Sequence, residues 1–491
     1  MNTRLRFGVC WFAGGMILAL LSVGQGQAAP RPGAAKGPEK PEPAPPGRTC
    51  HVDWDKGSDE TGDGSAGKPW KTPWHAAGQA QGGATIIVHA RSDGKPYYNG
   101  GQPVLKAIVP DLRWQAAKGE IVRISTTKEW GQNPYEAYPR ASTVVVGEAN
   151  AVIHGFGVWG SILVGARGDR CTIKGCDLSG GGDYQGFPAM IRTTGSPPNK
   201  TPDDWCEDLV VRNCTLHDNV KAMNQGPAND AMVLTYGAKG MIVENCEFHG
   251  GLNIGIKWKD RCNRMTARYC YFHDMPTGIQ GDGQYGVDWI DTHNNVFANI
   301  GRIAVAVENG APNRFSVRNN TFYNCAVDVG WWRGGGANVE IFNNIFCHRS
   351  GGFYQSYDEG WKGREYAYQD YNCFSGANDT CWRINGKKVA TTVAAWRQWL
   401  GDQLVGDACR DEHSTSDDPG FLNQSGAFKR QEDFKRKSYP KDGRPSASAI
   451  EAGAKWPEVM GAYVAGDEVI GPARKSTSPA TTKATQPAGR P

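Results

Sequence analysis

Two lysines in the segment GIKWK, Lys257 and Lys259, are spaced so that a strand would place both on one side. If Ile256 and Trp258 point into an apolar core, both lysines point outward. The opposite arrangement would bury two unpaired charges, at an order-of-magnitude cost of several kcal/mol each. A lysine whose pKa is lowered by neighbouring cations can act as a general base. The segment therefore contains two candidate bases.

Later segments of the same kind bring acidic and aromatic residues to the position of Lys259. These segments share an apolar residue, and the residues three positions after it form a column on successive repeats. Thr235 lies near this column, one repeat before Lys259. The residues of this column and its neighbours are Thr235, Lys259, Asp282, Glu308, Trp331, Trp332 and Arg333. At strand spacing such a column is roughly 15–20 Å long, which suits an extended sugar polymer. An alignment error of one residue would turn it to the other face.

One chemistry that this column could perform is β-elimination from a uronate-containing polysaccharide. A base removes the weakly acidic proton beside the uronate carboxylate, whose charge must be neutralised by Ca²⁺ or an arginine. Lys259 or Lys257 would be the base, and Arg333 would grip the substrate. Asp282 and Glu308 would hold Ca²⁺, the one cofactor that this hypothesis names.

Two other functions remain open. In a glycoside hydrolase, Asp282 and Glu308 would themselves be the acid and its partner. Their backbones would lie about 4.8 Å apart on neighbouring coils, near the ~5–5.5 Å carboxyl separation of retaining enzymes. In a non-catalytic carbohydrate-binding or surface protein, only platforms such as Thr235, Trp331 and Trp332 would matter. A lyase requires a lysine clustered with carboxylates and an arginine, whereas a hydrolase requires two facing carboxylates with no central base. Outward charges that only serve solubility would give the same pattern.

The elements that position this column belong to an internal repeat. A short phrase ending in a large apolar residue recurs at Leu178, Leu216, Phe248, Phe272, Phe297, Phe322 and Phe346, and its last four steps are 24, 25, 25 and 24 residues. Each unit contains short alternating segments separated by Gly, Asn or Asp, which indicates strands rather than helices. Units of this size bury a core only by stacking. We therefore predict an all-β fold, a right-handed parallel β-helix (solenoid).

Two further columns follow from the same alignment. Two residues before each large apolar residue stand Cys176, Cys214, Cys246, Cys270, Asn295, Asn320 and Asn344. We expect them to form a cysteine ladder continued by an asparagine ladder, with disulfide pairing left open. His217, His249 and His273 follow the apolar residue and should face outward on neighbouring coils. Zn²⁺ binding there is the weaker interpretation, since three histidines on a flat face seldom converge tetrahedrally.

The chain resembles the secreted right-handed β-helix proteins of the pectate-lyase-like superfamily. The resemblance is carried by the coils, by the opening stretch HVDWDKGSDETGDGSAGKPWKTPWHAAGQAQGGATIIV (51–88), and by DPGFLNQSGAF (418–428) near the end. It implies a short N-terminal cap helix and covers roughly 51–465. Activity does not carry over, because this fold hosts several chemistries. The paired aspartates that precede the lysine of pectate lyases are missing, and so are the motifs of polygalacturonases and of arginine-based lyases.

Composition and the two ends of the chain predict an exported protein, with an uncleaved N-terminal anchor as the minor alternative. Among 491 residues, 54 basic and 50 acidic residues give a net charge of +4, which is no footprint for nucleic acid. Arg4, Arg6 and the following apolar run are typical of a signal peptide. The expected organisation is signal peptide 1–29, Pro-rich disordered linker 30–48, N-terminal cap and first coils 49–142, β-helix repeats 143–352, irregular and helical C-terminal flank 353–465, and disordered tail 466–491.

These observations lead to one overall hypothesis. We expect a secreted protein, extracellular or periplasmic, that acts on an acidic polysaccharide as a monomer, with no nucleic-acid partner and no membrane span once the signal is removed. A uronate-directed polysaccharide lyase is the main prediction, with the hydrolase and the binding protein as alternatives.

Overall fold

A computed structural model gives the fold of the chain. The residues that it describes are 47–138, 141–184, 187–194, 205–220, 231–282, 287, 289–308, 314–332, 339–347, 352–356, 368–375, 381–384, 387–403, 411–423, 428–444 and 457–472. The chain divides into two compact units, Met1–Pro43 and Ala44–Pro491, and every described residue belongs to the second. The predicted signal peptide 1–29, nearly all of the linker, and Arg333 lie outside the described residues.

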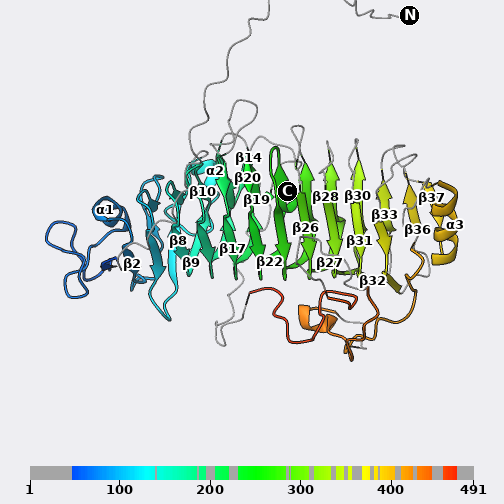
Figure 1. Ribbon diagram of the computed structural model, residues 1–491. Coiled ribbons are helices and arrows are strands. Elements are labelled where there is room, and N and C mark those ends of the chain that lie inside the picture. Colours follow the sequence, from blue (N-terminus) through cyan, green and yellow to red (C-terminus); the bar gives the residue numbers. More distant parts are fainter. Residues whose placement is uncertain are drawn as a thin grey trace, which may run out of the picture. The chain divides into compact units, whose positions relative to one another are not determined.

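The second unit is a right-handed parallel β-helix whose coils contribute short strands to three faces, seen as rows of neighbouring strands in Figure 1. The first face is the 12-stranded sheet, and the second and third faces share the 21-stranded sheet. Strands of the first face are β1 Thr49–Val52, β2 Thr85–Val88, β5 Arg113–Ala116, β8 Val152–His154, β11 Thr172–Lys174, β17 Val210–Arg212, β21 Ile242–Glu244, β24 Met265–Arg268, β26 Trp289–His293, β28 Arg314–Arg318, β31 Val339–Phe342 and β34 Tyr368–Asp370.

The second and third faces meet within two long strands, β25 (Tyr271–Asp282) and β27 (Val296–Glu308), which each serve both faces. The second face also contains β3 Tyr97–Tyr98, β6 Val122–Ser125, β9 Phe156–Gly160, β12 Asp177–Gly180, β18 Thr215–Asn219, β22 Glu247–His249, β29 Thr321–Tyr323, β32 Ile345–Cys347 and β35 Cys373–Ser375. The third face also contains β4 Leu105–Ala107, β7 Val144–Val146, β10 Ile162–Val164, β15 Ile191–Thr193, β19 Ala231–Tyr236, β23 Ile254–Lys259, β30 Val327–Trp332, β33 Gly352–Ser356, β36 Cys381–Ile384 and β37 Lys387–Ala390.

Smaller elements lie between and at the ends of the coils. They are the antiparallel hairpin β13 Gly182–Tyr184 and β14 Phe187–Ala189, the pair β16 Cys206–Glu207 and β20 Ala238–Lys239, the helices α1 Pro73–Gln79, α2 Pro134–Ala137 and α3 Val393–Gln403, and the 3₁₀ helix η4 Gln431–Phe434. The predicted cap helix is α1, where Ala76 and Ala77 join the main core, and α3 forms the predicted helical flank. The predicted fold class is therefore confirmed. No described helix has the length and apolar character that crossing a membrane requires.

Stacked phenylalanines fill the core behind the second face. Phe248, Phe272, Phe297 and Phe322 are fully buried, and successive ring centroids lie 4.6, 4.9 and 5.0 Å apart. The strand pairings join Phe248 to Phe272, Phe272 to Phe297 and Phe297 to Phe322, so the alignment made from the repeat is the true register here. Stacked rings at strand spacing bury a continuous apolar surface and add direct aromatic contact.

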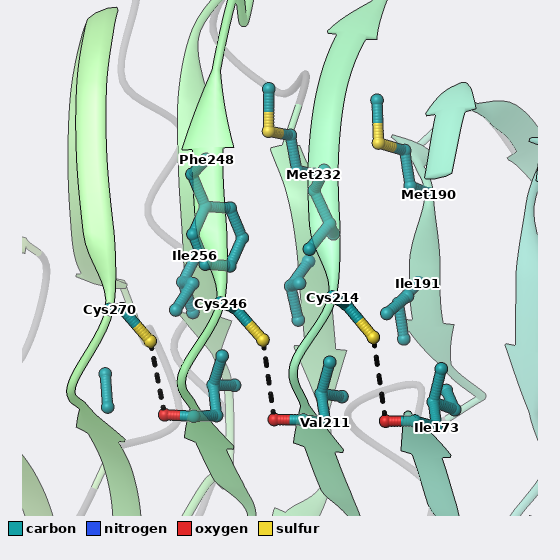
Figure 2. Packing of buried hydrophobic residues seen from close by; sticks show 14 of the residues in the cluster. Ile173, Met190, Ile191, Val211, Cys214, Met232, Cys246, Phe248, Ile256 and Cys270 are labelled. Carbon is teal, nitrogen blue, oxygen red and sulfur yellow. Dashed lines mark hydrogen bonds between the residues drawn. The ribbon is translucent and has the colours of Figure 1, made fainter. Parts of the chain in front are cut away.

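The ladder beside the phenylalanines changes chemistry part-way along the molecule. Cys214, Cys246 and Cys270 are free, buried thiols, and Figure 2 shows each donating to a carbonyl oxygen of the preceding coil, at 3.6–3.7 Å. Farther on, Asn320 makes the equivalent bond from Nδ2 to the carbonyl of Thr292 at 2.9 Å. Its Oδ1 also accepts from the backbone N–H of Asn295 at 3.0 Å. An asparagine rung thus satisfies more buried polar groups than a cysteine rung.

A C-terminal segment runs back along the outside of the coils. Four corner asparagines with left-handed φ of 51–57° donate their side-chain amides to carbonyl oxygens of residues 457–469, and the pairs are Asn343–Pro457, Asn319–Val459, Asn294–Ala462 and Asn245–Val469. Asparagine tolerates this conformation better than most residues. Apolar side chains of the segment, including Met460 and Tyr463, pack on Tyr271 and Tyr323 of the second face.

Candidate active site

The predicted column lies on the outer surface of the third face. The strand pairings place Lys259 beside Asp282, Asp282 beside Glu308, and Glu308 beside Trp332, on four successive coils. The alignment from the sequence agrees with this register residue by residue. Ile256 and Trp258 lie in the main core, so the predicted outward direction of the two lysines is also confirmed.

Thr235 does not belong to the column. It pairs with Trp258 and is fully buried, and its hydroxyl lies 3.3 Å from the Sγ of Cys262. The residue that pairs with Lys259 is Tyr236. The prediction that Thr235 lies beside the column was therefore wrong by one residue, and one residue is enough to turn a side chain from the outer surface to the interior.

The aromatic and guanidinium groups predicted at the far end have a mixed outcome. In the strand register Trp332 pairs with Glu308, as predicted, whereas Trp331 pairs with Val307. Trp331 therefore does not hold a position of the Lys259–Asp282–Glu308 column. Arg333 lies outside the described residues, so its role stays a prediction.

Lys257 points outward but is buried, with 3% of its surface exposed. Its Nζ lies 2.9 Å from Oδ2 of Asp282, and that side chain is about as well buried. Taking both charges out of water is costly, and their mutual attraction offsets that cost only because the geometry is close. The interpretation of this surface as solvated charges fails for this pair.

Two further residues of the site were missed from the sequence. The ring of Tyr236 has the Cζ of Arg192 at 5.5 Å and the Nζ of Lys259 at 5.7 Å. Arg192 and Tyr236 are 6% and 4% exposed, whereas Lys259 is partly exposed. Burial raises the pKa of Tyr236 and the charge of Arg192 opposes this, while Asp260 raises it further, so the phenol stays protonated. Arg192 comes from a coil whose insertion breaks the 24-residue spacing, so no periodic signal pointed to it.

Apolar residues pack beside these charges. Ala189, Ala231, Leu234, Tyr236 and Ile254 form a buried hydrophobic cluster on this surface, separate from the main core. Ala189 belongs to the β13–β14 hairpin, which the repeat does not contain. A low-dielectric border of this kind strengthens electrostatic interactions within the site.

The two carboxylates of the column have different surroundings. Burial raises the pKa of Glu308 and the neighbouring Asp282 raises it further, while Lys257 and Arg302 oppose the shift. Arg302 Nη2 lies 3.9 Å from Glu308 Oε1, and the side chain of Gln280 also bonds this carboxylate. Asp282 is instead paired directly with Lys257. The site therefore contains one carboxyl whose pKa is raised and one that contacts an ammonium directly.

The residues predicted to hold Ca²⁺ do not fit that ion. Calcium takes six to eight oxygen ligands, but Asp282 already faces the ammonium of Lys257 at 2.9 Å. Among the residues that the structure describes, no group of three or more His, Cys, Asp or Glu side chains has an arrangement suited to a metal.

A second polar column, on the outer surface of the second face, is the predicted histidine column. The rings of His217, His249 and His273 are stacked at 5.1 and 5.0 Å. His217 lies 2.8 Å from Asp177 and 2.9 Å from Asp218, and burial, which would lower its pKa, is outweighed by these carboxylates, so the pKa is raised to about 9. Stacked parallel rings cannot direct three nitrogens at one ion.

Glu247 and Asp274 flank His273 in the same way and raise its pKa against the effect of burial. The pKa of the central His249 is lowered, by burial and then by the two neighbouring imidazoles. The direction of the pKa shift therefore alternates along the column: raised at His217, lowered at His249 and raised at His273.

The family model described as "Right handed beta helix region" matches residues 150–346. The resemblance to right-handed β-helix proteins is thereby confirmed. No curated protein matches the chain.

Among solved structures, XylC in complex with xylose is 11% identical, with a TM-score of 0.41 over 70% of this chain and 86% of that one. A rhamnogalacturonan lyase is 10% identical, with a TM-score of 0.40 over 77% and 91%. The GH136 lacto-N-biosidase from Eubacterium ramulus is 12% identical, with a TM-score of 0.38 over 70% and 66%. At such identities and TM-scores these similarities carry no argument about activity.

Proposed function

We propose that the protein is exported and acts on an extracellular acidic polysaccharide as a β-eliminating lyase. The observation that carries this proposal is the cluster itself: two lysines, an arginine and two carboxylates on neighbouring coils of one surface. This combination separates a lyase from a hydrolase with a bare carboxylate pair. The signal-like N-terminus supports export.

In this proposal Lys259 is the base. It is the lysine with partial exposure, whereas Lys257 is buried against Asp282. Lys259 takes the proton beside the uronate carboxylate, the C–H electrons form the new double bond, and the bond to the glycosidic oxygen breaks. Water supplies the proton that the leaving oxygen needs. The positive charges of Arg192 and Lys257 stabilise the negative charge that develops on the substrate carboxylate. Trp332 is the candidate stacking surface, and Arg333 the candidate grip on the polymer.

Absorbance near 235 nm tests this proposal, because the unsaturated product of uronate elimination absorbs there. The purified protein is incubated with pectate, alginate, polyglucuronate and glycosaminoglycan. We expect a rise on at least one polymer and a loss of about 10²–10⁴-fold in Lys259→Ala. Lys106→Ala is the matched control, since Lys106 lies several coils earlier in the outward column that contains Lys257. A flat trace on every polymer would reject the lyase.

A glycoside hydrolase is the second candidate, favoured by the different surroundings of the two carboxyls. Glu308 would be the general acid because burial raises its pKa, and Asp282, which contacts Lys257, would be its partner carboxylate. Release of reducing ends without absorbance at 235 nm, abolished in Glu308→Gln, would support it. Binding without either product would leave the non-catalytic carbohydrate-binding protein.

A further inference from the structure

The ion pair between Lys257 and Asp282 is unusual for its position. It lies on the outer surface of a coil, yet 4% of the Lys257 side chain and 10% of the Asp282 side chain are exposed. Most outward charges of a solenoid stay in water, where an ion pair contributes little. A pair taken out of water requires a compensating arrangement around it.

Other polar side chains beside the ion pair supply further oxygen atoms. Gln280 pairs with Lys257 in the strand register and is 4% exposed, and its side chain bonds Glu308. The carbonyl oxygen Oε1 of Gln280 is buried without a hydrogen-bond partner among the residues that the structure describes. Asp282 thus contacts the ammonium at 2.9 Å, Glu308 is close enough for the charge of Lys257 to act on it, and the buried amide of Gln280 lies on the next coil beside Lys257. Carboxylate and amide oxygens are also the ligands that hard divalent cations prefer.

We propose that the ammonium of Lys257 takes the place of a divalent cation at this site. Lys257 holds Asp282 and balances the charge of Glu308 from within the chain, so the site works without Ca²⁺ and binds it only when Lys257 is removed. This inference rests on the proposed function, because it states how the same site neutralises its own charge and that of its substrate. Lys257 then supplies a fixed positive charge, and Lys259 alone is the base.

The reason is electrostatic exclusion. A divalent ion bound to Asp282 would lie within a few ångströms of the Lys257 ammonium, and like charges repel strongly in a buried, low-dielectric site. Without the ammonium, Asp282 and Glu308 would be two carboxylates on neighbouring coils that have lost the cation 2.9 Å from Asp282, while Arg302, 3.9 Å from Glu308, is more than half exposed. A bound divalent cation relieves that repulsion.

Calcium binding is measured by titration calorimetry and by the shift of the thermal unfolding midpoint, neither of which depends on activity. The wild type, Lys257→Met, Lys257→Arg and the double variant Lys257→Met/Asp282→Asn are compared with CaCl₂ at about 5 mM, above the millimolar affinities of many extracellular calcium modules. Lys106→Met is the matched control in the same outward column.

We expect the wild type, Lys257→Arg and Lys106→Met to show no calcium-dependent shift. Lys257→Met should unfold at a lower temperature and regain part of that loss with calcium, with an affinity about tenfold or more above wild type, and the double variant should lose this response. Should Lys257→Met fail to fold, Lys257→Gln replaces it. Failure of both to fold even with calcium would count against the proposal.

Two other results overturn the inference. One is calcium binding by the wild type that disappears in Asp282→Asn, and the other is a Lys257→Met protein that folds but gains no affinity. Neither depends on whether any polymer is cleaved. If the wild type cleaves no polymer while the calcium results are as expected, the proposed chemistry fails and the role of Lys257 stands.

Discussion

Two polar columns lie on the outside of this β-helix, and they handle charge in opposite ways. In the histidine column, His217 and His273 are each flanked by two carboxylates, and three of these four, Asp177, Asp218 and Asp274, have 62–67% of their side chains exposed, against 21% for Glu247. On the third face, Asp282 of the outer column is instead buried together with Lys257 of the preceding coil. Their opposite charges meet between the two coils. The repeat makes both columns, so stacking alone does not indicate function. Burial of charge distinguishes them, because it costs free energy that solubility does not require.

The largest expected effect is a loss of stability when the buried ion pair beside the outer column is broken. Lys257→Met leaves Asp282 buried without its partner, so we expect the free energy of unfolding to fall by about 3–5 kcal/mol. Lys257→Met/Asp282→Asn should recover a large part of that loss. Chemical denaturation of the two single variants and the double variant measures the coupling. Additive effects of the two substitutions would show that the buried pair contributes no more than exposed charges do.

A smaller effect is expected at His217, and it depends on pH. Its folded pKa, about 9, is above the value of about 6.5 expected when unfolded. The stabilisation is therefore fully present below about pH 6.5 and is lost as the pH rises through about 9. His217→Gln should lower the free energy of unfolding by roughly 2 kcal/mol at pH 6 and by almost nothing above pH 9. A pH-independent loss would contradict the role of Asp177 and Asp218.

The smallest effect is expected at His249, with the opposite sign. Its pKa is lowered by burial and by its two imidazole neighbours, so protonation at acid pH opposes folding. His249→Gln should be as stable as the wild type at pH 8. At pH 5 it should unfold at a higher temperature, with a gain in the free energy of unfolding of less than about 1 kcal/mol. Melting curves at both pH values measure this, with His75→Gln as a control outside the column. A variant that is less stable than wild type at pH 5 would mean that the central imidazole binds a proton favourably.

The fold could be predicted because its information is repeated in the sequence. Phe248, Phe272, Phe297 and Phe322 stand 24 or 25 residues apart, and each coil needs the same residue type at the same corner and in the same core position. Register errors are costly in such a stack, since one residue of shift would expose every inward side chain. The same spacing fixed Lys259, Asp282 and Glu308 correctly.

The rest of the site could not be predicted, because it depends on parts of the chain that do not repeat. An insertion interrupts the 24-residue spacing before Tyr236, so the alignment indicated Thr235 instead. Arg192 lies in a coil that another insertion lengthens, so no spacing indicated it. The burial of Lys257 was not visible either. A strand pattern tells which way a side chain points, but whether that direction leads into water depends on what else packs there, such as Ala189 of the β13–β14 hairpin.

The C-terminal segment 457–469, which runs back along the coils, has a consequence for biosynthesis. Coils of a solenoid can stack one after another as they are made, but the bonds from Asn343 to Pro457 and from Asn245 to Val469 join residues 114 and 224 positions apart. They form only when nearly the whole chain has left the ribosome. A chain broken before Pro457 would lack these bonds and the side chains of Met460 and Tyr463 that pack on Tyr271 and Tyr323, which would make it a better target for the proteases that remove incomplete proteins. The contacts of residues 457–469 would thus form only in chains whose synthesis is nearly complete.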